Sequence, residues 1–419
     1  MLIYRSIVKE QVPLIVRIKK SILRRIKPYT LRGKRMFLRF YRSIINNKPG
    51  LNLVGYFSYT SGVAEVGRFF TQRIKSSQVP FLIYDIEAPS YKKLDDTNLK
   101  EYQHYFTTKT VYSKNIFFIN ADALPYLKLK LPELFIGRYN AAVFFWEFND
   151  YFNFPEAFKA INEAIAFTEF IATAVRKAAP STVKVTKLDF PFIKNWQINK
   201  SPAVIRNELG IDGNEFVFIF NFDFHSVYER KNPEAILKAF DLAFSSTDNV
   251  KLIMKSIHAE GNSGNFEKFQ FAVSKMKMKN KITVVNENLS RNEFMSMINA
   301  ADCYISLHRS EGLGLGMMEA MSMGKPVIAT RYGGNTDFMN DENSLLVNYE
   351  LVPVREGAEP YKAEWLWADA NVKEAAEYMQ KLYKDRVFSN DLGKCAEEYI
   401  RNYYSQDKFL RNFNIWREC

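Results

Sequence analysis

A chain of 419 residues, of which 47% are hydrophobic, is long enough for two α/β domains with separate cores. It holds no apolar run near the ~18 residues that a membrane-spanning helix needs, so no spanning segment is expected. Its three cysteines are widely separated and its four histidines are not clustered, so neither a disulfide framework nor a zinc site is supported. The net charge of +12 is concentrated at one end, because residues 1–50 carry 14 Lys or Arg and one acidic residue.

Residues 1–48 form a basic arm with a helical pattern. Ile15, Ile18, Ile22 and Ile26 recur at helical spacing, with Lys and Arg on another face, and a second segment of this kind follows before Pro49-Gly50. A basic amphipathic helix suits the surface of an anionic membrane. The alternative is that its apolar stripe packs on the protein's own body or on a second subunit; nucleic acid is not expected, because no aromatic platform accompanies the charge.

From residue 49 the chain alternates short apolar runs with helical patterns, which predicts a first domain over residues 49–195. A strand over 52–57, a small-residue turn over 58–62, a helix over 63–77 and a strand over 81–86 form a βαβ unit. Further strands are predicted at 116–119, 141–148 and 164–168. The polar stretch 194–201 marks the domain junction.

A second alternating series predicts another domain over residues 203–395. Strands are predicted at 216–222, 250–257, 282–286, 303–307 and 326–330, with helices beginning near 233, 266, 291 and 314. Near-continuous apolar strands separated by helices indicate parallel sheets covered on both faces. The fold class is therefore α/β, with two doubly wound, Rossmann-like domains facing a cleft, where ligands bind beyond the carboxyl ends of the strands.

The stretch SEGLGLGMME, residues 310–319, follows a predicted strand and combines three glycines with two acids. Glycines at 312, 314 and 316 let backbone amides approach a ligand, and the helix N-terminus that follows favours a phosphate. Glu311 and Glu319 would repel phosphate but accept hydrogen bonds from sugar hydroxyls. A nucleotide sugar satisfies both requirements, whereas the simpler alternative is a capped helix with both acids in solvent.

The segment 306–348, SLHRSEGLGLGMMEAMSMGKPVIATRYGGNTDFMNDENSLLVN, resembles the retaining glycosyltransferases of family four, or glycosyl transferases group 1, of the polysaccharide- and lipopolysaccharide-assembly type. That family has the two-domain GT-B fold and carries two glutamates with seven residues between them, followed by EAM, GKPVIAT and GG elements. All four occur here in the family's order. The resemblance spans residues 51–419 and is strongest over 216–348.

The resemblance implies roles for the second-domain residues. Glu319 would hold the nucleotide ribose and Glu311 the donor-sugar hydroxyls, while Lys231 would neutralise the diphosphate. The family's arginine position is Ser226 here, so Arg230 is expected to supply the second cation. The loop residues near the donor would be Gly312, Leu313, Gly314, Leu315, Gly333, Gly334, Asn335 and Thr336, and Lys255 is a further donor-side candidate at a strand end.

In the first domain, Ser61 and Gly62 resemble the family's glycine loop near the reacting centre, although one glycine replaces the usual pair. Glu147, in a Trp-Glu element, is a candidate for positioning the acceptor; a structural carboxylate is the alternative. Residues 396–419 resemble the family's final helix, which crosses back to the first domain. The histidines are expected to be structural, with His308 the best functional exception.

The implied reaction moves a sugar from a UDP- or GDP-linked donor to a glycan or lipid-linked acceptor, with retention and without an enzyme nucleophile. No cofactor and no metal is expected, since cations and helix N-termini can stabilise the leaving diphosphate. The expected setting is a bacterial cytoplasm, at the inner face of the membrane, in surface polysaccharide or lipopolysaccharide synthesis. The alternatives are a nucleotide-sugar epimerase or hydrolase of the same fold, or a non-catalytic membrane-surface adaptor.

Overall fold

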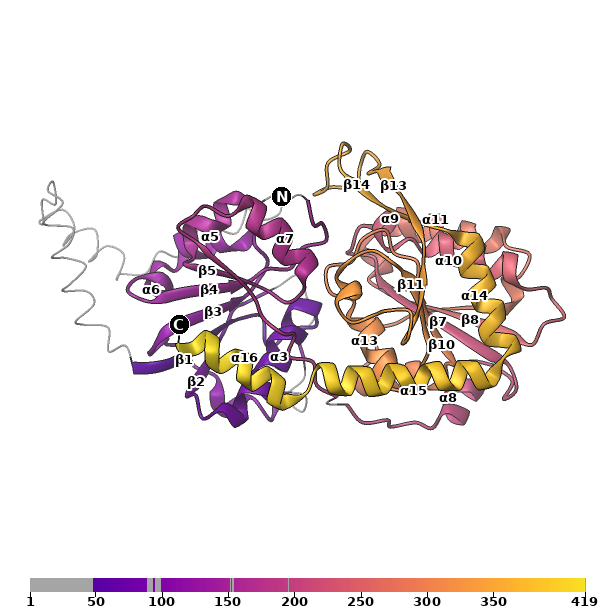
Figure 1. Cartoon of the computed structure of the whole chain (residues 1–419), viewed down its shortest axis with the longest axis horizontal. Helices are drawn as coiled ribbons and strands as arrows, with labels where there is room; N and C mark the ends of the chain where they lie inside the picture. The colour runs from indigo at the N-terminus through magenta and orange to yellow at the C-terminus, as the bar shows by residue number, and fades with distance from the viewer. Residues whose placement is uncertain are drawn as a thin grey trace, which may run out of the picture.

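The computed structural model describes residues 48–418 except 89–92, 95–98, 151, 153 and 195, and builds two α/β domains in sequence (Figure 1). Residues 1–47 lie outside the described part, so the helical and membrane-binding predictions for the basic arm stay predictions. Within the described residues, none of the helices combines the length and the apolar character that crossing a membrane requires.

The first domain contains a six-stranded parallel sheet with the order β2-β1-β3-β4-β5-β6. Its strands are β1 (Lys48–Gly55), β2 (Phe81–Asp85), β3 (Tyr112–Phe118), β4 (Tyr139–Val143), β5 (Glu163–Ala166) and β6 (Lys184–Lys187). Its helices are α3 (Gly62–Ile74), η2 (Lys75–Ser77), η3 (Gln103–Tyr105), α5 (Ala123–Lys130), α6 (Pro132–Phe135), η4 (Pro155–Ala160) and α7 (Glu169–Ala178). The strand order reverses between β1 and β3, so the loop after β1 borders a crevice at the carboxyl edge.

The second domain contains a six-stranded parallel sheet with the order β12-β11-β10-β7-β8-β9. Its strands are β7 (Phe216–Asp223), β8 (Val250–Ile257), β9 (Ile282–Asn286), β10 (Cys303–Ser306), β11 (Val327–Thr330) and β12 (Leu345–Val347). Its helices are α8 (Pro202–Glu208), α9 (Tyr228–Lys231), α10 (Pro233–Ala243), η5 (Ala259–Gly261), α11 (Ser263–Lys275), η6 (Lys279–Lys281), α12 (Arg291–Ala300), α13 (Leu315–Ser322), η7 (Gly334–Asp337) and α14 (Val372–Lys384). Here the order reverses between β7 and β10.

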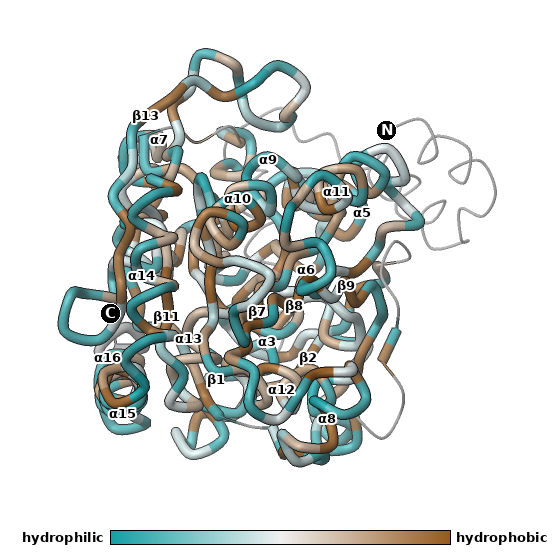
Figure 2. Tube along the Cα trace, turned by 90° about the vertical axis from the view of Figure 1, so that its right-hand side faces the viewer, coloured by the Kyte–Doolittle hydropathy of each residue, from teal (hydrophilic) through white to brown (hydrophobic). Residues whose placement is uncertain are grey.

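The strands are buried because nearly every residue in them is apolar. In β7, Phe216, Phe218 and Phe220 point to one face and Val217 and Ile219 to the other, and all five are at most 2% exposed. In Figure 2, strands such as β11 are mostly brown, whereas the outer turns of α14 are largely teal. The prediction of an α/β fold with two parallel sheets is therefore confirmed.

A hairpin that the sequence did not predict follows β12. Strands β13 (Tyr349–Pro353) and β14 (Leu366–Ala370) pair antiparallel. The loop between them carries Tyr361 and Trp365, which pack with Trp146 and Phe148 of the first domain at ring-centroid distances of 4.9 to 6.0 Å. The hairpin loop therefore joins the core of the first domain and ties the two domains together.

The chain crosses back to the first domain between its last two helices. Helix α15 (Arg386–Tyr403) packs on α13, and α16 (Gln406–Glu418) packs on α3 (Figure 1). Arg73 Nη1 donates to Gln406 Oε1 at 2.7 Å, and Gln406 Nε2 donates to the Arg73 backbone carbonyl at 2.8 Å. Phe70 contacts the rings of Phe409 and Phe413. Helix α15 begins before the predicted boundary at residue 396 and runs through it. The chain crosses between the domains near residues 404–405.

One predicted strand is shorter in the structure. The sequence predicted a strand over 141–148, but β4 ends at Val143, and residues 144–148 leave the sheet. Phe144, Trp146 and Phe148 remain almost fully buried because they enter the aromatic cluster beneath the hairpin loop. The prediction extended the strand too far because these apolar residues are buried although they lie beyond the end of β4.

Candidate functional site

The two predicted cations and Glu311 lie at the point where the second sheet reverses its strand order. Lys231 and Arg230 are in α9, which follows β7, and Glu311 follows β10, the neighbouring strand. Asn232 adopts a left-handed conformation with φ 51° and ends α9, and its side chain donates to the carbonyl of Leu307 at 2.9 Å. The fold therefore brings together charged residues that are about 80 positions apart in sequence.

Glu311 is neutralised by both cations. Its Oε2 lies 2.5 Å from Lys231 Nζ and 3.4 Å from Arg230 Nη1, and Arg230 also donates to the Ser310 carbonyl at 2.9 Å. Burial alone would raise the pKa of Glu311, but the charges of Lys231 and Arg230 outweigh it and lower that pKa to about 2. Glu311 is therefore an anion at neutral pH, able to accept hydrogen bonds but not to donate a proton.

Glu147 joins the same charge cluster from the first domain. Its Oε1 lies 3.7 Å from Arg230 Nη2, and its Oε2 accepts a hydrogen bond from the Tyr361 hydroxyl at 3.0 Å. The Ser310 hydroxyl donates to the Glu147 backbone carbonyl. The predicted acceptor-side carboxylate therefore meets the predicted donor-side residues, held in place by the hairpin loop.

Glu319 is 2% exposed and pairs with a residue that the sequence did not single out. Arg291 Nη1 lies 2.6 Å from Glu319 Oε1, and Arg291 Nε lies 3.7 Å from Glu65 Oε1 in the first domain. The guanidinium also lies over the rings of Trp196, at 5.0 Å, and Phe69, at 5.7 Å. Burial raises the pKa of Glu319, and the Arg291 charge opposes that rise. A ribose at Glu319 would have to compete with Arg291.

Gly312 is required by close contact with the first domain. A Cβ at this position would lie 2.1 Å from the Trp146 carbonyl oxygen, and the Thr168 hydroxyl donates to the Gly312 carbonyl at 2.8 Å. Gly334 packs equally closely against Gly312, because a Cβ added at Gly334 would lie 1.8 Å from the Gly312 carbonyl oxygen. In this conformation the glycines allow the domains to touch, in addition to any role toward a ligand.

Replacing Gly312 with alanine should destabilise the protein, because backbone atoms on both sides of the contact would have to move. We expect a loss of about 1–3 kcal/mol in the free energy of unfolding, measured by chemical denaturation. The matched control is Gly264→Ala in α11, where an added Cβ meets no atom within 4 Å and a helix former is favoured. Equal stability of the two variants would contradict the contact.

The remaining loop residues shape the turn before and after α13. Gly314 has φ 86° and precedes the helix, while Leu313 and Leu315 pack against the core. Asn335 is fully buried and donates to the Thr330 carbonyl at 3.0 Å, and Thr336 donates to the Gly333 carbonyl at 2.8 Å. Both hydrogen bonds stay within the second glycine loop and its strand. The two loops are joined by the Gly334 amide, which donates to the Glu311 carbonyl at 2.7 Å.

Lys255 lies at the end of β8 and contacts backbone oxygens instead of the charge cluster. Its Nζ donates to the Ser256 carbonyl at 2.8 Å and to the Glu287 carbonyl at 2.6 Å, and the residue is 4% exposed. Burial lowers its pKa to about 8. The structure directs Lys255 toward the segment after β9, and its donor-binding role stays a prediction.

Stability should therefore depend on pH through Lys255. Between pH 8 and 10.5 the folded state has released a proton that the unfolded state retains, so the free energy of unfolding rises with pH over this window. Replacing Lys255 with methionine should remove this rise. The difference in free energy of unfolding between wild type and variant should therefore change by on the order of 3 kcal/mol from pH 8 to pH 10.5. Chemical denaturation at several pH values measures it. Lys238→Met, at an exposed lysine, is the control; parallel curves for all three proteins would contradict the assignment.

Ser61 and Gly62 open α3 at the carboxyl edge of the first sheet. The Ser61 hydroxyl accepts from the amide of Ala64 at 3.2 Å, and a Cβ at Gly62 would meet nothing within 4 Å. Arg68 braces the preceding loop by donating to the carbonyls of Phe57 and Tyr59. The loop is capped and held open at Gly62, which leaves room for a ligand.

His308 has a structural environment. It is fully buried, its Nδ1 lies 3.0 Å from the Ser306 hydroxyl, and its Nε2 donates to the Tyr332 carbonyl at 2.8 Å. Burial lowers its pKa, so it stays neutral. His308 therefore supports the strand that leads into the candidate site.

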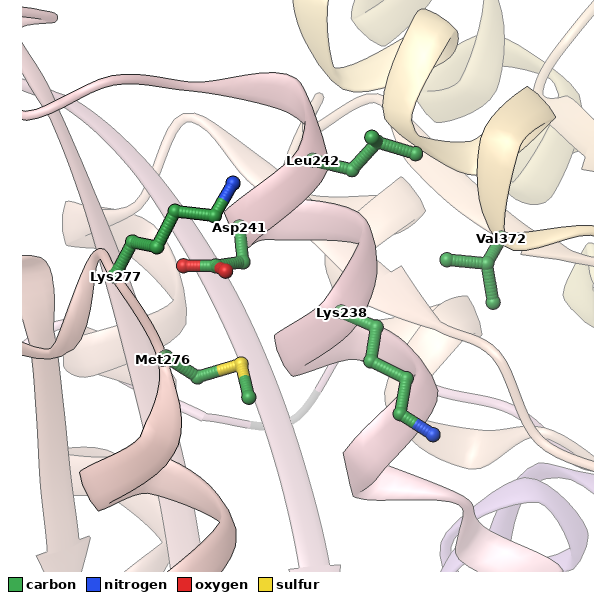
Figure 3. Close-up of a pocket in the computed structure, with 6 residues that line it drawn as sticks. All are labelled: Lys238, Asp241, Leu242, Met276, Lys277 and Val372. Atoms are coloured by element: carbon green, nitrogen blue, oxygen red, sulfur yellow. The ribbon is translucent and has the colours of Figure 1, made fainter.

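A separate pocket of about 290 Å³ lies on the second domain (Figure 3). It is lined by Lys238, Asp241, Leu242, Met276, Lys277 and Val372. None of the candidate site residues lines it. The pocket is therefore separate from the candidate site at Lys231, Arg230 and Glu311.

Comparison with known proteins identifies the second domain. Residues 203–399 match the family model described as glycosyl transferases group 1. The second domain therefore belongs to the glycosyl transferases group 1 family. The match includes Lys231, Glu311 and Glu319, so the resemblance inferred from the sequence is confirmed at the level of the family.

Two curated relatives match parts of the chain. The D-inositol 3-phosphate glycosyltransferase of Arthrobacter sp. (strain FB24) is 24% identical over 198 residues, which is 47% of this chain and 41% of that protein. The sulfoquinovosyl transferase of Arabidopsis thaliana is 28% identical over 120 residues, 29% of this chain and 20% of that protein. The chain therefore spans less than half the length of these curated relatives in the matched regions.

Solved structures share the architecture over most of the chain. A crystal structure of the Anabaena HepE protein in complex with UDP and glucose has a TM-score of 0.65 and 13% identity, covering 88% of this chain and 100% of that chain. The sucrose-phosphate synthase of Thermosynechococcus elongatus has a TM-score of 0.64 and 13% identity, covering 88% of this chain and 99% of that one. At this identity the likeness shows the fold, and the GT-B prediction is confirmed.

Proposed function

We propose that the protein is a retaining glycosyltransferase that moves a sugar from a nucleoside diphosphate sugar to a hydroxyl acceptor. The observation that carries this proposal is the cluster at the β7–β10 crevice, where Lys231 and Arg230 surround Glu311 beside the loop that leads to Glu319. Two cations suit a diphosphate, and two carboxylates suit the hydroxyls on either side of it. Membership of the group 1 family supports the same reaction class.

Donor binding exchanges partners within this cluster. The diphosphate takes over Lys231 and Arg230, which releases Glu311 to accept hydrogen bonds from the donor sugar. Glu319 binds the ribose hydroxyls in place of Arg291. UDP is the favoured nucleotide, because the solved relatives include the Anabaena protein with UDP and the pneumococcal O-GlcNAc transferase with UDP and GlcNAc.

The sugar is transferred by front-face attack. The bond between the anomeric carbon and the diphosphate oxygen breaks, a bond to the acceptor oxygen forms on the same face, and the acceptor proton passes to the departing phosphate oxygen. Lys231 and Arg230 stabilise the charge that develops on the diphosphate. Glu311, ionised and released from the two cations, orients the sugar and forms no covalent intermediate.

The acceptor enters from the first domain. Glu147, held by Tyr361 and near Arg230, is placed to accept a hydrogen bond from the acceptor hydroxyl, beside the open loop at Ser61 and Gly62. A glycan or lipid-linked acceptor of surface polysaccharide or lipopolysaccharide assembly fits the basic arm, which would hold the protein at an anionic membrane surface.

The test is to incubate the protein with UDP- and GDP-linked sugars and a bacterial lipid-linked glycan fraction, and to follow the anomeric carbon by NMR. Transfer with retained configuration, slowed roughly 10²–10³-fold in Lys231→Met, supports the proposal. Release of free sugar alone would indicate a hydrolase, and conversion of the nucleotide sugar without an acceptor would indicate an epimerase; either outcome would overturn it.

A further inference from the structure

Three potential metal ligands meet at the carboxyl edge of the second sheet, outside the charge cluster. Asp223 ends β7, His225 is in the loop that follows, and His258 comes directly after β8. Strands β7 and β8 pair in parallel with Asp223 opposite Ile257, so their loops leave the sheet side by side. One ligand atom from each of the three residues lies within 4.8 Å of the others.

The contacts within this cluster leave ring nitrogens available. His258 Nδ1 lies 2.8 Å from Asp223 Oδ1, which also accepts from the His225 backbone amide at 2.9 Å. The two imidazole rings are stacked, with centroids 4.0 Å apart and planes at 8°. In the part of the chain that the structure describes, His258 Nε2 and both ring nitrogens of His225 have no hydrogen-bond partner. Two imidazoles and a carboxylate are thus assembled with lone pairs to spare.

The backbone holds His258 in an uncommon conformation. Its φ of 60° and ψ of 30° are left-handed, which costs a residue with a Cβ on the order of 1 kcal/mol or more. The two loops are joined by Asn262, whose side chain donates to the Phe224 carbonyl at 3.0 Å, and Gly261 leaves room for the His225 ring. The surrounding structure therefore fixes the position of this imidazole despite the strain.

We propose that Asp223, His225 and His258 bind a divalent first-row transition cation, with Zn²⁺ the best match to the donor set. Asp223 Oδ1 and His258 Nδ1 are 2.8 Å apart, so they would have to separate slightly to reach the roughly 3.4 Å between tetrahedral ligands at ~2.1 Å from a cation. As the cation takes the place of the hydrogen between them, His258 stays neutral with its ring hydrogen on Nε2. His225, which is exposed, turns out of the stack to supply the third ligand atom, and water completes the coordination.

Such a cation would stabilise the loop between β7 and α9. This loop leads directly into Arg230 and Lys231, so the cation would steady both residues without belonging to the donor site. It is therefore a structural site that is separate from the sugar-transfer chemistry. No sequence motif indicates this site, because residues 223 and 258 are brought together only by the pairing of β7 and β8.

The test is a Zn²⁺ titration of tag-free, chelator-treated full-length protein by calorimetry, with Co²⁺ absorption as a second readout. Wild type should bind one cation per chain with saturation in the micromolar range. His225→Gln and His258→Asn should each weaken binding at least about tenfold. Asparagine is chosen at 258 because it tolerates the left-handed backbone.

Two controls make the result specific. His104→Gln removes an exposed histidine of the first domain, whose ring packs at a tilt against Tyr105, and Cys395→Ser removes an exposed thiol. Both should bind Zn²⁺ as wild type does. Absence of saturable one-to-one binding, or unchanged binding in His225→Gln, whose exposed side chain can be replaced without unfolding the protein, would overturn the proposal.

Discussion

Replacing Lys231 with methionine should lower kcat by roughly 10²–10³-fold, as removal of one preorganised charge-stabilising donor does in other active sites. Lys231 lies 2.5 Å from Glu311 and is one of two cations that would neutralise the departing diphosphate. Methionine keeps the length and the apolar stem of the side chain. The measurement is steady-state transfer of sugar from the preferred nucleotide sugar, with KM reported separately from kcat.

Lys268→Met is the matched control for this variant. Lys268 is a more exposed lysine on α11, paired with Glu229 in the same turn as Lys231, and it makes no contact with Glu311. Its loss should leave kcat within about twofold of wild type, as expected for a surface ion pair. Comparable activity of Lys231→Met and Lys268→Met would contradict the role given to Lys231.

Replacing Glu319 with glutamine should weaken UDP binding by about 10–100-fold, the loss expected for a charge-assisted hydrogen bond of about 1.5–3 kcal/mol. The carboxylate is 2% exposed and would accept from the ribose hydroxyls. Inorganic diphosphate, which has no ribose, should bind to wild type and variant equally. Calorimetric titration with both ligands separates the ribose contact from the diphosphate contact.

The same variant leaves Arg291 without its closest anion. Breaking a buried pair is destabilising, so the free energy of unfolding must be measured beside affinity. Arg291→Met in the Glu319→Gln background removes the stranded charge and should recover stability without recovering UDP affinity. Wild-type UDP affinity in a folded Glu319→Gln protein would contradict the ribose role.

The sequence predicted those parts of the site that depend on local pattern. Apolar strands alternating with helices predicted two parallel sheets, and the end of one of those strands placed the loop with Glu311 where a ligand is expected. The role of Lys231 was inferred from the family resemblance. The spacing between Glu311 and Glu319 led to the family that the comparison confirmed. These inferences succeeded because each depends on a short stretch of chain and on a general rule of sheet topology.

Contacts between segments far apart in the sequence were not predicted. In the sequence, Arg291 was assigned only as the start of a helix. The residues around it gave no indication that it would pair with Glu319 and approach Glu65 of the first domain. Tyr361 lies in a hairpin loop with no recognisable pattern, yet it holds Glu147. Side-chain pairing of this kind follows from tertiary packing, which periodicity does not encode.

The domain contact at Gly312 also exceeds what the sequence could show. Glycine in that loop predicted close approach of the backbone to something, and a ligand was the natural inference. The structure supplies Trp146 of the first domain as the neighbour. In the proposed reaction the donor would approach this same loop, which would couple donor binding to the relative position of the domains.

Thermal stabilisation by a panel of nucleoside diphosphates shows whether the protein holds a donor site for a nucleotide sugar. UDP, GDP, ADP and dTDP are each added to the purified protein with magnesium or with EDTA. A ligand at about 100 times its dissociation constant should stabilise the fold by about 2.7 kcal/mol. We expect a shift with UDP that does not depend on magnesium and is reduced by at least about half in Glu319→Gln. No shift with any nucleotide would contradict a donor site at Lys231, Glu311 and Glu319.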